Sequence, residues 1–322
     1  MEQCRIIDYS EEYRSLLRDY LYKTFPEYSR EYIEYLLDTS AGNVPSIMVI
    51  NEKDEVVGCH LYYCTKVMLR GNVSETHWGY DTFLEPDYRA EIGLELMLRI
   101  NATIGFGIGL TEINSKIQKK LKAVFFSGVY TYYTASWKFY LSPFQLLFGS
   151  EPKLFEKDVI RTGNYTFKRI RSVDELEIPN EGFWLGGKFD IEFVRDSTFI
   201  KDRFLENTVH PYLLFANINK EEPCYFVVRK TRYRGFPALT LCDYRYTTPK
   251  MVSIILRAVK KIACKSNLGI ILFVSGNQDM DEAMKHTIHY ASPIDFVSNN
   301  KKIAGMSFFV TGADSDADFL KG

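Results

Sequence analysis

The chain of 322 residues has almost no excess of charge of either sign, with 40 lysines and arginines against 41 aspartates and glutamates. Nucleic acids and anionic membrane surfaces recruit proteins through a strong positive field, which a formal net charge of −1 does not supply. We therefore expect neither of them as the main partner. With 46% hydrophobic and 25% charged residues, the composition is that of a globular protein and excludes a disordered chain.

The sequence also lacks the marks of a secreted or membrane-spanning protein. Its six cysteines form no Cys-x-x-Cys pair and lie mostly inside apolar runs, as reduced and buried cysteines do. No apolar leader follows Met1, and the longest uncharged run, residues 123–137, is shorter than the roughly 20 apolar residues of a membrane-spanning helix. We expect a soluble, cytoplasmic protein without a membrane span.

Several motifs of enzyme active sites are missing as well. No nucleophile elbow, Walker loop or cysteine–histidine pair stands out. Gly105, Gly107 and Gly109 alternate without the spacing of a dinucleotide-binding loop, which favours a strand that passes close to another backbone or to a ligand. His286 and His289 lack the spacing of a metalloprotease zinc site, so we expect no metal.

Aromatic side chains are in surplus. The chain has 22 tyrosines, 23 phenylalanines and 3 tryptophans, which together make up 15% of its residues. Aromatic residues favour strands and bury large areas, so we expect a sheet-rich fold. Many of the rings lie in residues 123–148 and 210–246, where we expect them to build an interface between two halves and its pocket wall.

The first half of the chain alternates between strand and helix patterns. Short polar turns join its first strands, which predicts antiparallel pairing. A basic helix capped by Thr111 and a strand-like aromatic stretch end this half. We expect strands over residues 4–8, 46–50, 56–68, 75–84 and 104–110, helices over 10–26, 28–37, 92–103 and 111–122, and strand-like structure over 123–148.

The second half repeats this order after residues 149–163, which look like a linker. An acidic tail from Gly312 onward is expected to fray. We expect strands over residues 165–170, 211–218, 224–232, 237–246, 268–275 and 306–311, and helices over 190–207, 249–265 and 278–289.

Equivalent elements of the two halves are separated by a nearly constant distance. The second strands start at residues 46 and 211, an offset of 165, and the strands after the amphipathic helix start at 104 and 268, an offset of 164. This regularity favours a duplication, although any α/β chain shows some recurrence. We expect an α/β (α+β) protein of two tandem domains, 1–150 and 164–322, with a linker at 151–163. Each domain is expected to be a mixed, mostly antiparallel sheet flanked by helices.

The order of elements and the segment FLEPDYRAEIGLELMLRI, residues 83–100, resemble the Gcn5-related N-acetyltransferases of the acyl-CoA N-acyltransferase superfamily. The resemblance covers residues 4–140, and more loosely 165–311. In that family, an Arg/Gln-x-x-Gly-x-Gly/Ala loop opens a helix whose backbone N–H groups hold the pyrophosphate of acetyl-CoA, as helix N-termini hold anions in general. The resemblance therefore implies acetyl-CoA as co-substrate.

Only part of this loop is present. Arg89 takes the Arg/Gln position and Gly93 is a glycine of the loop. Ile92 and Leu94 stand where the first glycine and the last small residue are expected, or else the loop is one residue shorter. The alternative is that Gly93 only allows the helix to pack against a strand. The resemblance implies cofactor contacts by Phe83, Leu84, Arg89, Ala90, Glu91, Ile92, Gly93, Leu94 and Asn114.

Asn114 matches the asparagine of the family's Asn-x-x-Ala-x-x-x-Tyr element, but Ile117 and Leu121 replace the alanine and the tyrosine. That tyrosine is the family's usual general acid, so this role is unassigned here. The tyrosines at the start of the aromatic stretch are typical of a buried strand. Four lysines of the same helix either meet a phosphate of coenzyme A or form a solvated helix face.

The second half has no phosphate-binding loop, since its strand-to-helix junction LCDYRYTTPKMV contains no glycine. Its segment RFLENTVHPY, residues 203–212, resembles a segment of tandem acetyltransferase-like proteins of bacterial surface-polysaccharide clusters. Tandem copies also occur in peptidoglycan-bridge aminoacyltransferases and N-myristoyltransferases. The resemblance implies at most one intact active site, in the first half, with the second half shaping the acceptor pocket.

An acetyltransferase of this kind needs a base that deprotonates the acceptor amine. His77, Asp81 and Glu85 precede the loop, and alternation along a strand places every second residue from 77 to 85 on one face. We expect these three side chains to point into one cleft. The alternative is a polar row that faces solvent, with the residues between them forming the core face.

The leading hypothesis is an acyl-CoA-dependent N-acyltransferase that acetylates a small amine such as an amino sugar. The alternatives are a peptidoglycan-precursor aminoacyltransferase-like enzyme, and a pseudoenzyme or binding module that keeps the fold without catalysis. One feature of the structure bears on them. The strands near 75–84 and 104–110 are expected to run parallel and to part near Phe83, so that pantetheine fits between them.

Overall fold

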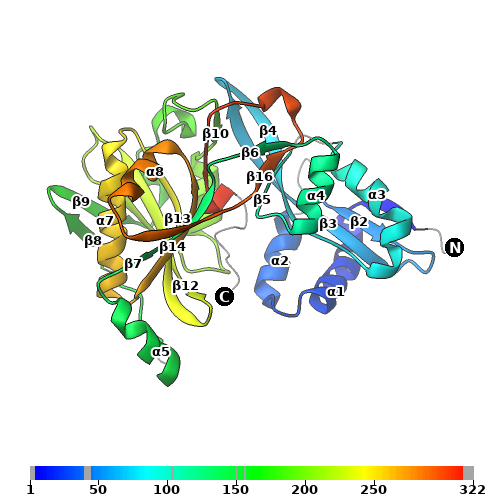
Figure 1. Ribbon diagram of the computed structural model, residues 1–322, viewed down its shortest axis with the longest axis horizontal. Coiled ribbons are helices and arrows are strands. Elements are labelled where there is room, and N and C mark those ends of the chain that lie inside the picture. Colours follow the sequence, from blue (N-terminus) through cyan, green and yellow to red (C-terminus); the bar gives the residue numbers. More distant parts are fainter. Residues whose placement is uncertain (1–3, 40–44, 103–104, 150, 156, 315–322) are drawn as a thin grey trace. The chain divides into compact units, whose positions relative to one another are not determined.

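The computed structural model describes residues 4–39, 45–102, 105–149, 151–155 and 157–314 (Figure 1). The chain divides into two compact units. Unit 1 comprises Met1–Lys66, Ser74–Phe125 and Phe296–Ala304, and unit 2 comprises Val67–Val73, Phe126–Asp295 and Gly305–Gly322. Neither unit is one contiguous stretch of sequence. The sequence halves 1–150 and 164–322 are therefore the two copies of the proposed duplication. They do not coincide with the two compact units of the folded chain.

A mixed sheet forms the centre of unit 1. β1, β2 and β3 pair antiparallel in sequence order, β4 runs parallel to β5, and β16 pairs antiparallel with β5. The strands expected in residues 4–110 are all present. They are β1 (Arg5–Asp8), β2 (Ile47–Ile50), β3 (Val56–Leu69), β4 (Asn72–Leu84) and β5 (Gly105–Ile108), joined by β6 (Val124–Phe126) and β16 (Phe296–Ser298).

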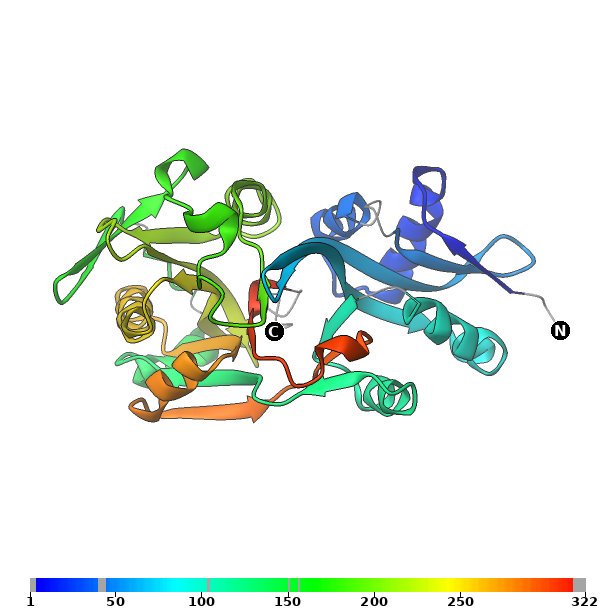
Figure 2. The same cartoon turned by 90° about the horizontal axis from the view of Figure 1, so that it is seen from above.

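Helices lie on both faces of this sheet, α1 (Arg14–Thr24) and α2 (Arg30–Thr39) on one and α3 (Arg89–Ile100) on the other (Figure 2). α3 buries Ile92, Leu96, Met97 and Ile100, the spacing of an apolar helix face, against β2 and β3. α4 (Glu112–Lys120) follows β5, and the Thr111 side chain accepts a hydrogen bond from the N–H of Asn114. The predicted Thr111 cap is confirmed.

Unit 2 contains a larger sheet. Its strands pair in the order β8, β9, β11, β12, β13, β14, β7, β15, all antiparallel except the β13–β14 pair. The strands are β7 (Tyr130–Ala135), β8 (Val159–Thr162), β9 (Tyr165–Ile170), β10 (Ile191–Phe193), β11 (Leu213–Asn217), β12 (Cys224–Tyr233), β13 (Phe236–Tyr246), β14 (Ile270–Gly276), β15 (His289–Pro293) and β17 (Phe308–Thr311).

Two hydrophobic cores cover the two faces of the unit 2 sheet. α7 (Lys250–Lys265) and α8 (Gln278–Lys285) bury their apolar sides against one face. The other face is covered by Trp184, α6 (Ser197–Ile200) and one turn of π-helix (Lys201–Leu205). The strongly amphipathic helix expected over residues 249–265 is confirmed, because its repeat alone specifies a helix docked on a sheet.

The two units repeat one topology, with a strand exchanged between the sequence halves. In each unit a parallel pair, β4–β5 or β13–β14, is followed across the sheet by an antiparallel strand, β16 or β7. β16 comes from the second half of the sequence but belongs to unit 1, and β7 comes from the first half but belongs to unit 2. This shared topology supports the proposed duplication.

Several local expectations are wrong. The end of the aromatic stretch is a helix, α5 (Ser142–Phe148), and the segment expected to be a linker contains β8. The expected helix over residues 190–207 begins with a strand, β10, and contains only the short α6 and the π-helical turn. The start of the acidic tail does not fray, because Gly312, Ala313 and Asp314 are buried. Residues 315–322 lie outside the described part of the chain.

Candidate functional site

The parallel strands of unit 1 separate soon after they meet. β4 and β5 pair at His77 with Gly105 and at Trp78 with Phe106, after which β4 continues to Leu84. The prediction that these strands run parallel is confirmed, and they part earlier than expected, after Trp78 instead of near Phe83. The backbone groups of β4 beyond Trp78 are therefore released from β5 at the approach to α3.

α3 begins directly after this opening. The chain makes one 3-10 turn (Pro86–Tyr88), and the helix starts at Arg89, whose Nε donates to the carbonyl oxygen of Leu84 at 2.9 Å. The first N–H groups of a helix have no intrahelical acceptor, and its dipole places partial positive charge there. The N–H of Arg89 already donates to the carbonyl oxygen of Pro86. The start of α3 therefore offers an anion the remaining N–H groups of its first turn and the positive end of the dipole, with the exposed Arg89 side chain beside them.

The residues that replace the family's glycines have distinct surroundings. Ile92 is 4% exposed and packs in the core, whereas Leu94 is 67% exposed. A Cβ at Gly93 would lie 3.6 Å from a methyl group of Leu84, an ordinary contact distance. Helix packing therefore does not require glycine at position 93, which weakens the alternative explanation for this residue.

Glu91 adds negative charge in the first turn of α3, next to the exposed Ala90. Its carboxylate accepts a hydrogen bond from the backbone N–H of Cys4 at 3.3 Å. A carboxylate in this position interacts favourably with the helix dipole, so it competes with any other anion at the helix start.

Aromatic residues from the α1–α2 region pack on the opposite face of β4. The ring of Phe83 lies against those of Tyr20 and Phe25, with centroids 6.4 and 6.0 Å apart. The Tyr28 hydroxyl donates to the Asp81 carboxylate at 2.5 Å. The contact of Tyr28 with Asp81 was not predicted from the sequence. The run of aromatic residues from Phe25 onward is the local feature that could have pointed to Tyr28.

Glu85, the last of the three predicted catalytic residues, lies just after β4. One carboxylate oxygen of Glu85 is 3.4 Å from the Nζ of Lys23, and its side chain is partly exposed. Asp81 and Glu85 thus lie four residues apart at the end of β4, each with a partner from α1 or the turn that follows it.

His77 does not share their face, so the one-face prediction is wrong for this residue. Its ring centroid is 4.2 Å from that of Tyr62, which belongs to the core beneath α3. Because Asp81 contacts the α1–α2 side, the alternation of β4 is interrupted between these two residues. Burial lowers the pKa of His77 to about 4.

His60 stands next to His77 in the same core. Its Nδ1 lies 2.6 Å from the Thr82 hydroxyl, and its Nε2 has no hydrogen-bond partner among the described residues. Burial and, secondarily, His77 lower the pKa of His60 to about 3. Both histidines are therefore neutral at physiological pH and pack as polar members of the core.

Asn114 lies in the first turn of α4, where its backbone N–H bonds the Thr111 cap. Two of the four lysines in and after α4 have partners on this helix or beside it. Lys116 pairs with Glu112 at 2.6 Å, and the Nζ of Lys119 lies 5.3 Å from the ring centroid of Phe125. These contacts favour the solvated-face interpretation for Lys116 and Lys119.

The equivalent opening in unit 2 is filled by the chain itself. β13 and β14 pair from Ala238 with Ile270 to Thr240 with Leu272, and then separate. β17 pairs antiparallel with Ser275 and Gly276 of β14, whose other edge is already occupied by β7. β17 therefore lies on the edge of β14 that faces β13.

A buried ionic network fixes β17 in this place. Asp243 of β13 accepts from Arg195 Nε and from Arg245 Nη1, each at 2.8 Å, and from the Thr311 hydroxyl at 2.6 Å. Arg195 also pairs with Asp314. Burial raises the pKa of Asp243, but the two guanidinium groups outweigh it and bring the pKa to about 2.

This network was not predicted from the sequence. Asp243 and Arg245 are two residues apart in an apolar strand, so their opposite charges lie on one face of the strand. This pattern is the feature of the sequence that could have indicated a buried ion pair. Arg195 and Asp314 are distant in sequence, and nothing local connects them to β13. With β17 in place and no glycine at the start of α7, unit 2 lacks the opening found in unit 1.

The segment 203–212 forms part of a basic cluster on the unit 2 face opposite α7. Arg203 and Arg229 are buried, and Asn207 accepts a hydrogen bond from the backbone N–H of His210 at 2.9 Å. Burial, with the charges of Arg229 and Arg203, lowers the pKa of His210 to about 3.

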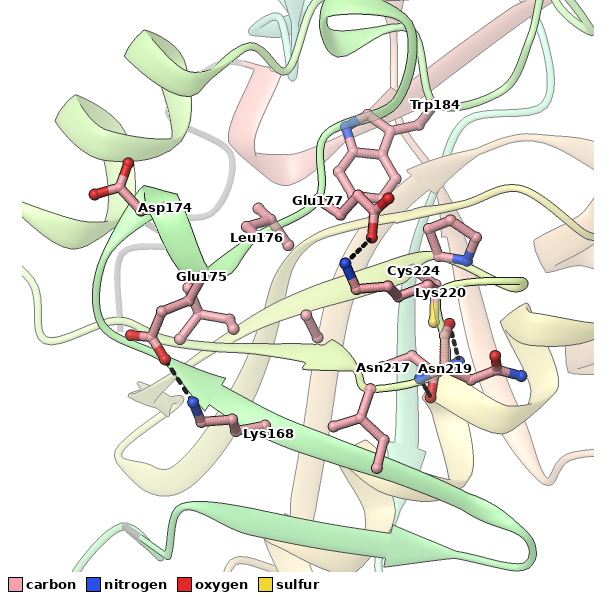
Figure 3. A pocket seen from close by; sticks show the side chains of 14 residues that line it. Lys168, Asp174, Glu175, Leu176, Glu177, Trp184, Asn217, Asn219, Lys220 and Cys224 are labelled. Atoms are coloured by element: carbon pink, nitrogen blue, oxygen red, sulfur yellow. Dashed lines mark hydrogen bonds and ion pairs between the residues drawn. The ribbon is translucent and has the colours of Figure 1, made fainter.

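A pocket of about 510 Å³ lies on the same face of unit 2, at β9, β11 and the chain that crosses them (Figure 3). Trp184 and Cys224 contribute to its apolar part. Its two lysines are each paired at the rim, Lys168 with Glu175 at 2.8 Å and Lys220 with Glu177 at 3.2 Å. None of the predicted site residues lines this pocket.

No three histidine, cysteine, aspartate or glutamate side chains in the described ranges come together as ligands for a metal ion. Over the same residues, no helix has the length and apolar character needed to cross a membrane.

Comparison with known proteins defines the fold. No protein-family model matches the chain, and no curated protein matches its sequence. A GCN5-related N-acetyltransferase from Anabaena variabilis superposes with a TM-score of 0.60 at 10% identity, over 92% of this chain and 72% of that chain. A probable N-acyltransferase from Enterococcus faecalis gives a TM-score of 0.55 at 13% identity, over 92% of this chain and 72% of that one.

The chain thus has the fold of the acyl-CoA N-acyltransferase superfamily. Its tandem form is also that of N-myristoyltransferase. The Saccharomyces cerevisiae enzyme with bound myristoyl-CoA superposes with a TM-score of 0.60 at 9% identity, over 92% of this chain and 78% of that chain. The predicted fold class, two tandem α/β domains with this fold, is confirmed.

Proposed function

We propose that this protein is an acyl-CoA-dependent N-acyltransferase whose active site is the opening between β4 and β5 of unit 1. The observation that carries the proposal is the parallel pairing of these strands, which ends after Trp78 and Phe106, ahead of the start of α3. The amide groups of pantetheine can pair with strand edges released in this way, and the helix start can hold the pyrophosphate. The proposed co-substrate is acetyl-CoA.

The residues at the start of α3 fit this ligand in part. Arg89 and the free N–H groups of the first helical turn, at Ala90 and Glu91, supply positive charge and donors. Glu91 opposes an anion there, and Ile92 takes the place of a glycine that would allow closer approach. We therefore expect weak binding of the pyrophosphate, with pantetheine contacts along Phe83 and Leu84 and a contribution from Asn114 at the start of α4.

In the proposed reaction, the neutral acceptor amine attacks the thioester carbonyl carbon. The C–N bond forms, the C–S bond breaks, and the thiolate takes up a proton. Asp81 or Glu85 serves as the base that removes a proton from the amine. His77 has a positioning role, because it packs against Gly105 where β4 and β5 meet. The proposed acceptor is a small amine such as an amino sugar.

Titration with acetyl-CoA, followed by thermal unfolding and by release of free thiol in the presence of amino sugars, tests the proposal. A ligand at about 100 times its Kd adds roughly 2.7 kcal/mol of stability. Arg89→Ala should weaken acetyl-CoA binding by about fivefold to tenfold, the loss of one charge-assisted contact. Arg99→Ala, in the last turn of the same helix and paired with Asp8, is the matched control.

The catalytic roles need a separate measurement. Asp81→Asn and Glu85→Gln are compared. The variant that lacks the base should release thiol about 100-fold more slowly or slower still, without a change in acetyl-CoA affinity. The proposal is abandoned if no acyl-CoA changes the thermal stability of the wild-type protein.

A binding module without catalysis is the second candidate function. The burial of Ile92 in the core and the carboxylate of Glu91 at the helix start favour it. This candidate, which has lost the cofactor site, predicts neither a shift in thermal stability with acyl-CoA nor thiol release with any amine, so the same experiment separates the two functions.

A further inference from the structure

α5 is an amphipathic helix whose polar side faces the protein and whose apolar side faces solvent. Its polar residues Ser142 and Gln145 are buried, whereas Phe144, Leu147 and Phe148 are 58%, 77% and 79% exposed. The residues before the helix continue this apolar surface, with Trp137 89% exposed. A surface helix of a globular protein normally places its apolar side against the core. We call the side chains of this segment that are more than half exposed the α5 face: Trp137, Phe139, Tyr140, Phe144, Leu147 and Phe148.

Polar contacts hold α5 with this face outward. The Gln145 side chain donates to the carbonyl oxygen of Asn267 at 2.6 Å, and the Ser136 hydroxyl donates to that of Leu268 at 2.5 Å. Gly269 permits the close approach, since a Cβ there would lie 2.2 Å from the Ser142 oxygen. The contacts with the turn before β14 therefore fix the orientation of α5.

The size of the α5 face calls for a partner. The largest apolar patch on a typical soluble monomer is about 300–600 Å², and each fully covered aromatic side chain accounts for about 150–250 Å². Six exposed large side chains on one short segment reach or exceed that range. Covering each of them would contribute roughly 1.5–3 kcal/mol, so the uncovered state is costly in water.

Charge and residue type favour a lipid surface as that partner. Residues 137–149 contain no aspartate or glutamate, and their one charged side chain is Lys138, whose Nζ lies 3.4 Å from the Tyr140 hydroxyl. Tryptophan and tyrosine favour the boundary between lipid headgroups and acyl chains, and lysine is attracted to anionic lipids. The segment thus combines both attractions locally, although the whole chain has a net charge of −1.

The shape of this region is also better suited to a lipid surface than to a second copy of the chain. In Figure 1, α5 extends away from the sheet of unit 2 at the lower edge of the view. A stable protein interface takes about 20–30 residues from each side, whereas an interfacial helix needs only to insert its apolar side chains by about 5–10 Å. The α5 face supplies six such side chains, which is fewer than a stable protein interface takes.

We propose that α5 is a membrane-surface anchor, which inserts the α5 face into the headgroup–acyl boundary of a bilayer that contains anionic lipid. The binding is peripheral and reversible. It does not depend on the proposed acyltransferase activity, since none of the candidate site residues lies on α5.

Sedimentation with vesicles tests the anchor. The wild-type protein should bind vesicles of phosphatidylcholine with one-fifth phosphatidylserine about fivefold more strongly than vesicles of phosphatidylcholine alone, the effect of one lysine near an anionic surface. Phe144→Ser, Leu147→Ser and Phe148→Ser combined should reduce that binding by tenfold or more. The matched control replaces three exposed apolar residues outside α5 by serine, Val73, Val159 and Ile218, and should bind as the wild type does. Equal thermal unfolding of the variants excludes a folding defect.

Tryptophan fluorescence gives a second readout. Trp137 is exposed, whereas Trp78 and Trp184 are buried, so a blue shift on addition of vesicles reports on Trp137. The shift should disappear in Trp137→Phe. The proposal is overturned if wild-type protein and triple variant bind vesicles equally, or if neither binds. It is also overturned if the wild type forms a dimer that the triple variant loses while vesicle binding is absent, because a second copy would then cover the α5 face.

Discussion

The parallel strand pairs of the two units separate in the same way, but the chain treats the two openings differently. In unit 2, β17 pairs with the free edge of β14 and is fixed by Asp243, Arg195 and Asp314. In unit 1, no strand of the described residues lies between β4 and β5, and the opening leads to the start of α3. The two units thus share a topology, but the opening of unit 2 is filled by a strand, whereas the opening of unit 1 is a candidate ligand site. The following variants test that difference.

The largest expected effect concerns the network that holds β17. Asp314→Ala leaves the buried Arg195 without one of its two carboxylates, and loss of one partner from a buried ion pair costs about 3–5 kcal/mol. Urea denaturation measures the loss. Asp158→Ala, which removes a surface ion pair with Arg171, is the control and should cost less than about 1 kcal/mol. A loss as small as the control's for Asp314→Ala would show that the network does not stabilise β17.

The second prediction concerns Glu192, which lies opposite Phe309 of β17 and is fully buried. Burial raises its pKa to about 7 from an unfolded value of 4.5. The folded state therefore holds a proton that the unfolded state has lost between about pH 4.5 and 7, so this group's contribution to stability falls as pH rises through that range.

The substitution Glu192→Gln removes this dependence. Above pH 7 the variant should be more stable than the wild type by up to about 3 kcal/mol, and the difference should shrink toward pH 5. Denaturation curves of both proteins from pH 5 to 8 measure it, and contributions from the buried histidines cancel in the comparison. Parallel stability curves would contradict the prediction.

The third prediction concerns the place where β4 and β5 meet in unit 1. A Cβ at Gly105 would lie 2.2 Å from Nε2 of His77, whereas a Cβ at Gly107 would lie 3.4 Å from the nearest atom. Gly105→Ala should therefore cost about 1–3 kcal/mol of stability, and Gly107→Ala less than about 1 kcal/mol. Thermal unfolding separates the two. Similar losses for both would mean that His77 moves aside easily.

The smallest expected effect concerns the charge at the start of α3. Glu91→Gln removes a carboxylate from the place proposed for the pyrophosphate, so acetyl-CoA should bind about twofold to fivefold more tightly. Calorimetric titration measures the change, and Glu95→Gln, one turn further along the helix, is the control. Tighter binding in both variants would indicate a general charge effect instead of a local one.

Regular local patterns made part of the fold predictable. The repeat of apolar residues specified α7, and the polar turns between short apolar runs specified the antiparallel strands of both halves. The order of elements indicated the parallel pair β4–β5, and Thr111 was recognisable as a cap. These features depend on residues close together in the sequence, so no knowledge of the packing was needed.

Other features depend on contacts that local patterns do not encode. The end of the aromatic stretch, residues 142–148, looked like a strand because aromatic side chains favour sheets, but it folds as the helix α5, packed on the turn at Asn267. The single face expected for His77, Asp81 and Glu85 failed because β4 does not keep regular alternation. The exchange of β7 and β16 between the sequence halves had no local signal.

The sequence by itself determined the kind and order of most elements and indicated the repeat at an offset of about 165 residues. The tertiary structure decided which strand occupies which free edge, and hence that the opening of unit 2 is filled. The reason is physical, because backbone N–H and C=O groups are the same in every strand and do not encode their partner. Charged residues as distant as Arg195, Asp243 and Asp314 select that partner, and they meet only in the folded chain.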